Sequence, residues 1–238
     1  MPSPQKLPCV VSKVLSHGNR VYTIELHPKN RFPKFVNGQF LHLALDPYDP
    51  SNFWPESRVF SIASGNTNLE SLKITYSVQG KFTTRMEKEL HAGKEVWIKM
   101  PYGDFIIENS RPASLIAGGT GITAFSGLLE NLPEEYHNPI VVFYGARERS
   151  LLIYKDIVEK CDQVNKNFSA FYFLEAGEYI YPQEISGKIS IDQIWTRMQN
   201  PKEFNFYLSG PPEMLNKLSM DLKSQRINPD QIKIDAWG

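Results

Sequence analysis

Glycines are concentrated in residues 115–123, which read LIAGGTGIT. An apolar run ends at Gly118 and an amphipathic run follows, so Gly118, Gly119, Thr120 and Gly121 are expected in a turn between a strand and a helix. Glycines at such a turn let backbone N–H groups approach a pyrophosphate, and the helix N-terminus adds a favourable dipole. The spacing differs from the G-x-G-x-x-G pattern, so a tight turn that simply needs glycine explains the segment equally well.

Two further glycine-containing turns follow apolar runs, at residues 143–147 (FYGAR) and 207–214 (YLSGPPEM). Ligands of open α/β sheets lie outside the carboxyl ends of the strands, and all three turns fall at that edge. Arg147, Gly210 and Pro211 therefore join the candidate dinucleotide-binding residues. The simpler interpretation of the last turn, a strand end followed by a proline in the first turn of a helix, fits as well.

Residues 58–61 (RVFS) form a candidate site in the first half of the chain. On a strand, Arg58 and Phe60 share one face, and Val59 and Ser61 share the other. Taken without context, a strand with an exposed arginine and a cross-strand aromatic is the simpler interpretation.

A second candidate phosphate site lies at residues 80–83, where an apolar run ends and a helix begins. Gly80, Lys81, Phe82 and Thr83 offer backbone N–H groups and a hydroxyl. Tyr76, on the preceding run, is a further candidate cofactor-binding residue.

The elements that position these residues change character along the chain. From residue 8 to about 106 there are six short β-rich runs (CVVSKVL, RVYTIEL, QFLHLAL, RVFSIAS, LKITYSV and EVWIKM), with one helix predicted over residues 83–90. This pattern predicts a six-stranded antiparallel barrel. Beyond Arg111 and Pro112, apolar strands alternate with amphipathic helices, which predicts an α/β domain with a parallel sheet. The predicted domains are residues 1–108 and 109–238, with a polar linker near 107–113.

Composition excludes several classes of function. The chain of 238 residues has 26 basic and 26 acidic side chains, so nothing indicates a nucleic-acid binder. No run is long and apolar enough for a membrane helix, and the N-terminal residues lack the apolar core of a signal peptide, so a cytoplasmic location is expected. With Cys9 and Cys161 as the only cysteines, an iron–sulfur cluster or structural zinc site is not expected.

With these motifs in this order, the sequence resembles the ferredoxin-NADP reductase superfamily over nearly its whole length. The family's flavin motif Arg-x-Tyr-Ser resembles residues 58–61, and its Gly-x-x-Ser/Thr phosphate motif resembles residues 80–83. Four more motifs match: Gly38-Gln39-Phe40, Pro101-Tyr102-Gly103-Asp104-Phe105, Gly118-Gly119-Thr120-Gly121 and Gly210-Pro211-Pro212-Glu213-Met214. The resemblance implies a flavin-binding barrel followed by a nicotinamide-binding domain.

The resemblance also implies roles. Arg58 would pair with the flavin pyrophosphate, Phe60 would stack on the isoalloxazine ring, and Ser61 would hydrogen-bond near flavin N5. Thr83 and the backbone before it would hold the diphosphate of FAD.

Two departures from the family pattern bear on catalysis. Phe60 stands where tyrosine is commoner, and Ser209 stands where many members carry a cysteine beside the nicotinamide. The tail places Trp237 where related proteins have an aromatic that covers the flavin, although an aromatic packing against the last strand is an equal alternative.

Three functions remain open on the sequence. The first is an FAD-dependent NAD(P)H oxidoreductase that serves a separate acceptor such as ferredoxin, flavodoxin or an oxygenase. The second is a free-flavin reductase, which residues 80–83 disfavour because binding isoalloxazine alone needs no diphosphate cradle. The third is a non-autonomous electron-transfer subunit, like the one that serves dihydroorotate dehydrogenase, although that subunit carries a C-terminal cysteine cluster and this sequence has none.

The nucleotide preference is predicted from the third α/β strand, residues 171–177 (FYFLEAG). NADP-specific members of the family place a serine and an arginine near this point, whereas this sequence offers Leu174 and Glu175. A carboxylate accepts hydrogen bonds from ribose hydroxyls and repels a 2′-phosphate, so Glu175 favours NADH. Arg147 on the neighbouring turn is the residue that could favour NADPH instead.

Overall fold

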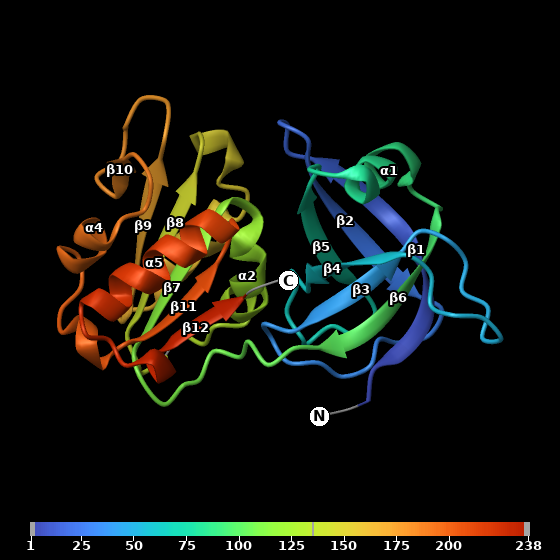
Figure 1. The fold of residues 1–238 in the computed structure, drawn as a ribbon, viewed down its shortest axis with the longest axis horizontal. Coiled ribbons are helices and arrows are strands. Elements are labelled where there is room, and N and C mark those ends of the chain that lie inside the picture. Colours follow the sequence, from blue (N-terminus) through green and yellow to red (C-terminus); the bar gives the residue numbers. More distant parts are fainter. Residues whose placement is uncertain (1–2, 135, 236–238) are drawn as a thin grey trace. The chain divides into compact units, whose positions relative to one another are not determined.

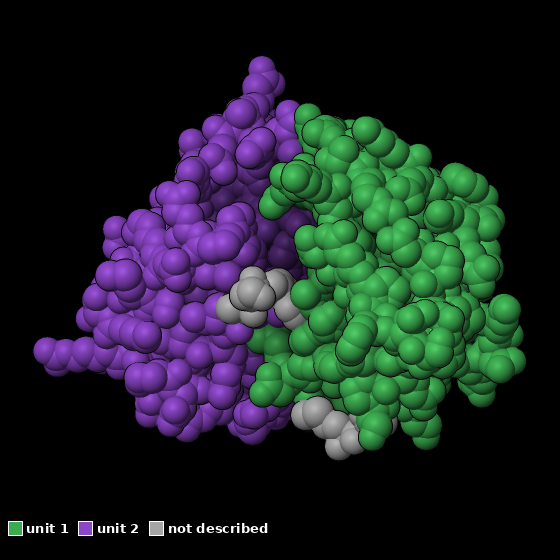
Figure 2. Space-filling view, turned by 45° about the vertical axis from the view of Figure 1, so that its right-hand side comes forward, with its two compact units in different colours: residues 1–106, 126–131 green, residues 107–125, 132–238 purple. Residues whose placement is uncertain are grey.

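The computed structural model describes residues 3–134 and 136–235. The chain divides into two compact units, which are coloured separately in Figure 2. Unit 1 comprises residues 1–106 and 126–131, and unit 2 comprises residues 107–125 and 132–238. Each unit has its own cluster of buried apolar side chains.

Unit 1 is an antiparallel sheet of six strands with one helix (Figure 1). Its elements are β1 (Gln5–Ser16), β2 (Val21–Pro28), β3 (Phe40–Ala44), β4 (Ser57–Ser61), β5 (Leu72–Ser77), α1 (Lys81–Glu89) and β6 (Glu95–Tyr102). The strand order is β4-β3-β6-β1-β2-β5. Just beyond the end of β4, the backbone N–H of Ala63 donates to the carbonyl of Lys73 on β5 at 2.8 Å, which brings the two outer strands together. The predicted six-stranded antiparallel barrel is confirmed.

Alternating side chains fill the interior of this barrel. Ile24 and Leu26 on β2, and Ile74 on β5, are fully buried, and the residues between them are more exposed on β2. This period of two is what a strand with one face on the core requires. Helix α1 buries Phe82 and Met86, which are four residues apart and lie on one face. The helix begins at Lys81, two residues before the predicted start.

Unit 2 is a parallel sheet with helices on its faces (Figure 1). The strands are β7 (Ala113–Gly118), β8 (Ile140–Ala146), β9 (Phe168–Leu174), β10 (Glu184–Ser186), β11 (Asn205–Ser209) and β12 (Ile232–Asp235). The helices that lie wholly in unit 2 are α3 (Lys155–Val164), α4 (Ile191–Trp195) and α5 (Pro212–Ser224), with short 3₁₀ turns between several elements. Helix α2 (Thr123–Glu130) follows β7, and its residues 126–130 are counted with unit 1. The order β10-β9-β8-β7-β11-β12 is parallel throughout. The predicted parallel α/β fold is confirmed.

Both faces of this sheet are buried, so ligands can reach it only at the ends of its strands. Phe143, Phe173 and Phe206 pack with α4 and α5, while Tyr144 and Tyr207, on the alternate positions, are also fully buried. The sequence did not predict the short strands β10 and β12. Within the described ranges, none of the helices combines the length and the apolar character needed to cross a lipid bilayer.

Candidate functional site

Strand β4 carries the first candidate residues of unit 1. Its register places Arg58 opposite Leu43 of β3. The Arg58 guanidinium lies over the Phe82 ring, with Cζ at 5.1 Å from the ring centroid, which is within the range of a cation–π contact. Phe82 is the second residue of α1, so Arg58 reaches the first turn of that helix. This brings together two motifs that are more than twenty residues apart in the sequence.

Arg58 also has a carboxylate partner. Its Nη2 donates to Glu56 Oε1 at 3.0 Å, and its Nη1 donates to the carbonyl of Ser57 at 2.8 Å. The side chains of Arg58 and Glu56 are 51% and 55% exposed. An ion pair this exposed contributes little to stability, so Arg58 can exchange Glu56 for another anion at small cost.

The first turn of α1 is built by Gly80 and Thr83. Thr83 Oγ1 accepts hydrogen bonds from the N–H groups of Gln79 at 2.9 Å and Gly80 at 3.1 Å, and donates to the carbonyl of Gly80 at 3.2 Å. The Thr83 hydroxyl therefore shapes the turn itself. The N-cap residue, Gly80, has no side chain that could cover the turn, and a Cβ at Gly80 would meet nothing within 4 Å. The turn, with exposed Lys81, is open to a ligand.

Aromatic rings support Phe60 from behind. The Phe60 and Tyr76 rings meet edge to face with centroids 6.2 Å apart, and Tyr76 stacks on Tyr22 at 5.6 Å. Tyr76 is only 3% exposed, and this burial raises the pKa of its hydroxyl. Tyr76 therefore packs against Phe60 from the interior of the barrel. Tyr22 in turn donates to Glu87 of α1 at 3.0 Å. Phe60 itself remains half-exposed at the surface.

Ser61 and Val59 occupy the alternate positions of β4. Ser61 is paired with Phe40 of β3 and is 8% exposed, while Val59 is half-buried opposite His42. The strand therefore presents Arg58 and Phe60 from one face, as the alternation predicts.

In unit 2 the glycine-rich turn follows β7, and close packing explains two of its glycines. A Cβ on Gly121 would lie 2.2 Å from the carbonyl oxygen of Ser209 and 2.7 Å from the nitrogen of Gly210. A Cβ on Gly118 would lie 2.7 Å from the sulfur of Met214. Gly119 differs, because its φ is +54° and a Cβ there would meet nothing within 4 Å.

The third turn packs on the first. Gly210 has a φ of +152°, and a Cβ there would lie 3.0 Å from the Cα of Gly118. Ser209 of β11 also pairs with Ala117 of β7 in the sheet. The loops after β7 and β11 thus meet at the carboxyl edge, with the exposed Pro211 beginning the turn into α5 and Thr120 partly exposed. The carbonyl of Thr120 accepts from Thr123 Oγ1 at 2.8 Å.

Ser209 has a partner that the sequence did not indicate. Its hydroxyl donates to Asp235 Oδ2 at 2.9 Å, and the two residues are 3% and 4% exposed. The hydroxyl expected to position nicotinamide is therefore engaged with a buried carboxylate on β12. The only local signal was an aspartate directly after residues 232–234 (IKI), in which apolar and charged side chains alternate.

Arg147 and Glu175 lie beside one another at the same edge. The N–H of Glu175 donates to the carbonyl of Ala146 at 3.2 Å, and the N–H of Ala176 donates to that of Arg147 at 2.8 Å. Both Arg147 and Glu175 are exposed. Glu175 Oε2 is 3.9 Å from Lys188 Nζ, a cation that the sequence analysis did not identify. Trp237, the candidate flavin cover, lies outside the described residues.

Part of the chain matches a known domain family. Residues 115–219 match the family model of the oxidoreductase NAD-binding domain. This range contains most of β7, all of β8 to β11 and the three turns at the carboxyl ends of the strands. The chain also has the fold of solved ferredoxin reductases, in agreement with the fold that the resemblance of the motifs implies.

Relatives resemble the chain over most of its length. The toluate 1,2-dioxygenase electron transfer component of Pseudomonas putida is 28% identical over 201 residues, covering 82% of this chain and 56% of that protein. The NAD(P)H-flavin reductase of Vibrio harveyi is 27% identical over 219 residues, covering 87% of each. A ferredoxin NADP+ reductase of Neisseria gonorrhoeae with bound FAD and NADP has a TM-score of 0.77 at 19% identity and 99% coverage of both chains. The chain spans little more than half the length of the oxygenase components that it matches.

The buried bond between Ser209 and Asp235 predicts a cost for removing the hydroxyl. Ser209→Ala takes one donor from a buried carboxylate, which typically costs about 1–3 kcal/mol of folding free energy. The midpoint of urea unfolding should fall accordingly. The control is Ser186→Ala at an exposed position of β10, which should change stability by less than about 0.5 kcal/mol. If the two variants have equal midpoints of urea unfolding, the hydroxyl of Ser209 does not have the structural role assigned to it.

Proposed function

We propose that the protein is an FAD-dependent NAD(P)H oxidoreductase that takes hydride from a reduced nicotinamide dinucleotide and passes the electrons to a separate acceptor. The observation that carries the proposal is the position of the Arg58 guanidinium over Phe82, at the first turn of α1, whose N-cap residue is Gly80. The proposed domains are those expected from the sequence, a flavin-binding part over residues 1–108 and a nicotinamide-binding part over residues 109–238.

The residues at the first turn of α1 fit a diphosphate. The turn offers backbone N–H groups at the positive end of the helix dipole, with no side chain in the way at Gly80. Arg58 adds a guanidinium, whose paired N–H groups match two phosphate oxygens. Its present partner Glu56 is exposed, so a phosphate can replace that carboxylate without stranding a buried charge.

Phe60 and Ser61 fit the redox ring of a flavin. Phe60 is half-exposed and is held from behind by Tyr76, so it offers a fixed surface for stacking. Ser61 comes next on the strand, at an alternate position where it is 8% exposed, and its role near flavin N5 is the one that the resemblance implies. When bound, FAD supplies an isoalloxazine ring that accepts hydride from nicotinamide and releases electrons to an acceptor.

The carboxyl edge of the parallel sheet fits the dinucleotide. The turn at Gly118, Gly119, Thr120 and Gly121 brings backbone close to the edge, and Gly210 and Pro211 lie against it. Ser209 would act on nicotinamide mainly through the position of its backbone, since its hydroxyl is engaged with Asp235. Hydride transfer needs close approach of donor and acceptor and no proton donor, which is compatible with this arrangement.

The proposed acceptor is a redox protein of an oxygenase system. Support comes from relatives named as electron transfer components of dioxygenases. A free-flavin reductase is the alternative. It is favoured by the match to the Vibrio harveyi flavin reductase, which covers the same share of both proteins. The diphosphate site at α1 favours bound FAD. The third possibility, a subunit of a larger redox complex, is compatible with the same relatives, which are named as components of oxygenases.

The cofactor itself tests the proposal. Purified protein, reconstituted with excess FAD and freed of unbound flavin, should be yellow and should release FAD on heating. The reason is that FAD has a diphosphate for the site at α1 to bind, whereas FMN has a single phosphate. Chromatography of the released flavin provides the measurement. Release of FMN, or the absence of any retained flavin, would contradict bound FAD and favour the free-flavin alternative.

Arg58→Ala should weaken FAD binding. A charge-assisted pair of this kind is typically worth about 1.5–3 kcal/mol, which corresponds to roughly ten- to a hundredfold in affinity. The dissociation constant can be measured by quenching of flavin fluorescence. Arg226→Ala, at an exposed arginine after α5, serves as the control and should retain the affinity of the parent. Tight FAD binding by Arg58→Ala would exclude the assignment of Arg58 to the diphosphate.

NADH should be preferred over NADPH, because the Glu175 carboxylate repels a 2′-phosphate. Steady-state kcat/KM values for both nucleotides provide the measurement, and Glu175→Ala should narrow the difference. The matched control is Glu203→Ala, which removes an exposed carboxylate that lies outside the candidate nucleotide-binding turns. A higher kcat/KM with NADPH would mean that Arg147 or Lys188 outweighs Glu175.

A further inference from the structure

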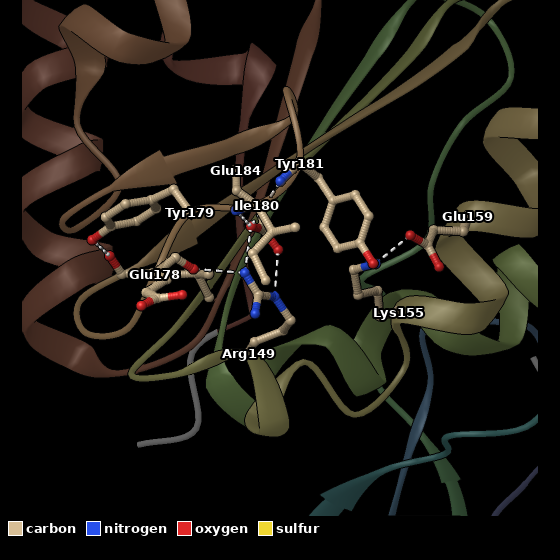
Figure 3. Close-up of polar contacts among 9 residues, drawn as sticks. Arg149, Lys155, Glu159, Glu178, Tyr179, Ile180, Tyr181 and Glu184 are labelled. Atoms are coloured by element: carbon tan, nitrogen blue, oxygen red, sulfur yellow. Dashed lines mark hydrogen bonds and ion pairs between the residues drawn. The ribbon is translucent and has the colours of Figure 1, made fainter.

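A buried carboxylate lies at the base of the loop between β9 and β10, residues 176–183. The Glu184 side chain is 0% exposed, and its two oxygens accept from Arg149 Nε at 2.7 Å and Nη2 at 2.6 Å. Oε2 also accepts from the backbone N–H groups of Ile180 at 2.8 Å and Tyr181 at 3.2 Å. Figure 3 shows Arg149 and Glu184 facing one another, with Tyr179 and Tyr181 on either side.

Arg149 links this loop to the neighbouring one. It lies in the short turn after β8, and its Nη2 also donates to the carbonyl of Glu178 at 2.6 Å. The guanidinium thus contacts both the carboxylate and the loop backbone. Its hydrogen bonds lower the pKa of Glu184 to about 2, so the pair is ionised at neutral pH.

A buried ion pair of this kind is a costly way to gain stability. Removing two charges from water consumes most of what their attraction returns, and apolar residues of similar volume are often as stabilising. The pair instead fixes the conformation of the loop, because Glu184 accepts two hydrogen bonds from Arg149 and two from the loop backbone. The same loop is tied at its start, where the Tyr179 hydroxyl donates to the carbonyl of Leu174 at 3.1 Å.

The loop held in this way presents apolar surface to solvent. Tyr179, Ile180 and Tyr181 are 43%, 62% and 51% exposed. Cations flank one of the rings, since Arg149 Cζ and Lys155 Nζ lie 5.7 and 4.9 Å from the Tyr181 centroid. A fixed loop with adjacent exposed apolar residues and positive charge is suited to a ligand that has a flat apolar part and phosphate.

The loop lies at the edge where a dinucleotide is expected. It begins directly after Glu175, and its first residue is hydrogen-bonded to the backbone of Arg147. We propose that Arg149 and Glu184 are positioning residues, which hold the 176–183 loop in the conformation that receives the adenosine diphosphate half of the nicotinamide dinucleotide. The inference rests on the proposed function, because it assigns the clamp to the dinucleotide.

Binding of ADP-ribose, measured by calorimetry on the full chain, tests this without any redox reaction. Glu184→Gln loses the ionic pair in a side chain of nearly the same shape, and Arg149→Lys keeps the charge but not the two-pronged geometry. Each should bind ADP-ribose about tenfold more weakly, because the ligand must then order the loop. Amide hydrogen exchange in residues 176–183 should accelerate, and the KM for NADH should rise by a larger factor than kcat falls.

Two further variants separate positioning from stability. Asp221→Asn breaks the exposed pair of Lys217 and Asp221 on α5 and should leave ADP-ribose binding at the parent value. The double variant Arg149→Met with Glu184→Leu replaces the pair by apolar side chains, so it should recover thermal stability but not affinity.

The outcomes distinguish this inference from the proposed function. A parent protein that binds ADP-ribose, with Glu184→Gln or the double variant binding it equally well, would overturn the clamp and leave the proposed function intact. A parent that does not bind ADP-ribose would overturn the dinucleotide assignment itself. Weaker binding together with faster exchange in the loop, and normal binding by Asp221→Asn, supports the clamp.

Discussion

The contact of Gly121 with the backbone of Ser209 and Gly210 is the constraint on which unit 2 depends. A parallel sheet covered on both faces has only its ends left for ligands, and this contact brings the loops after β7 and β11 together at one of those ends. No side chain can be inserted at the point of contact, so backbone is what the edge presents. The glycines therefore serve packing and exposure of backbone groups at once.

Arg58 and Arg149 differ in the burial of their carboxylate partners, and this difference determines whether each arginine can exchange its partner. Arg58 has an exposed carboxylate partner, and a pair of this kind is cheap to rearrange. Arg149 has a fully buried partner, and breaking that pair would leave an uncompensated charge in the interior. The first arginine is thus suited to exchange one anion for another, whereas the second is committed to the shape of the chain around it.

The sequence predicted those parts of the molecule that local pattern encodes. All six barrel strands, the α/β alternation and the motif at residues 80–83 follow from apolar periodicity and glycine placement. The strands β10 and β12 have only three and four residues, too short for any period to be recognised. The partners of Arg149 and Ser209 lie 35 and 26 residues away, so only the fold brings them together. Lys188 was missed for the same reason.

The shortness of β10 and β12 has a consequence for behaviour in concentrated solution. These strands form the two outer borders of the parallel sheet, where unpaired N–H and C=O groups could recruit another chain. An edge strand of three or four residues offers few such groups. Lys188, two residues after β10, also adds a positive charge that opposes pairing with another strand. The sheet of unit 2 is thereby protected against edge-to-edge aggregation.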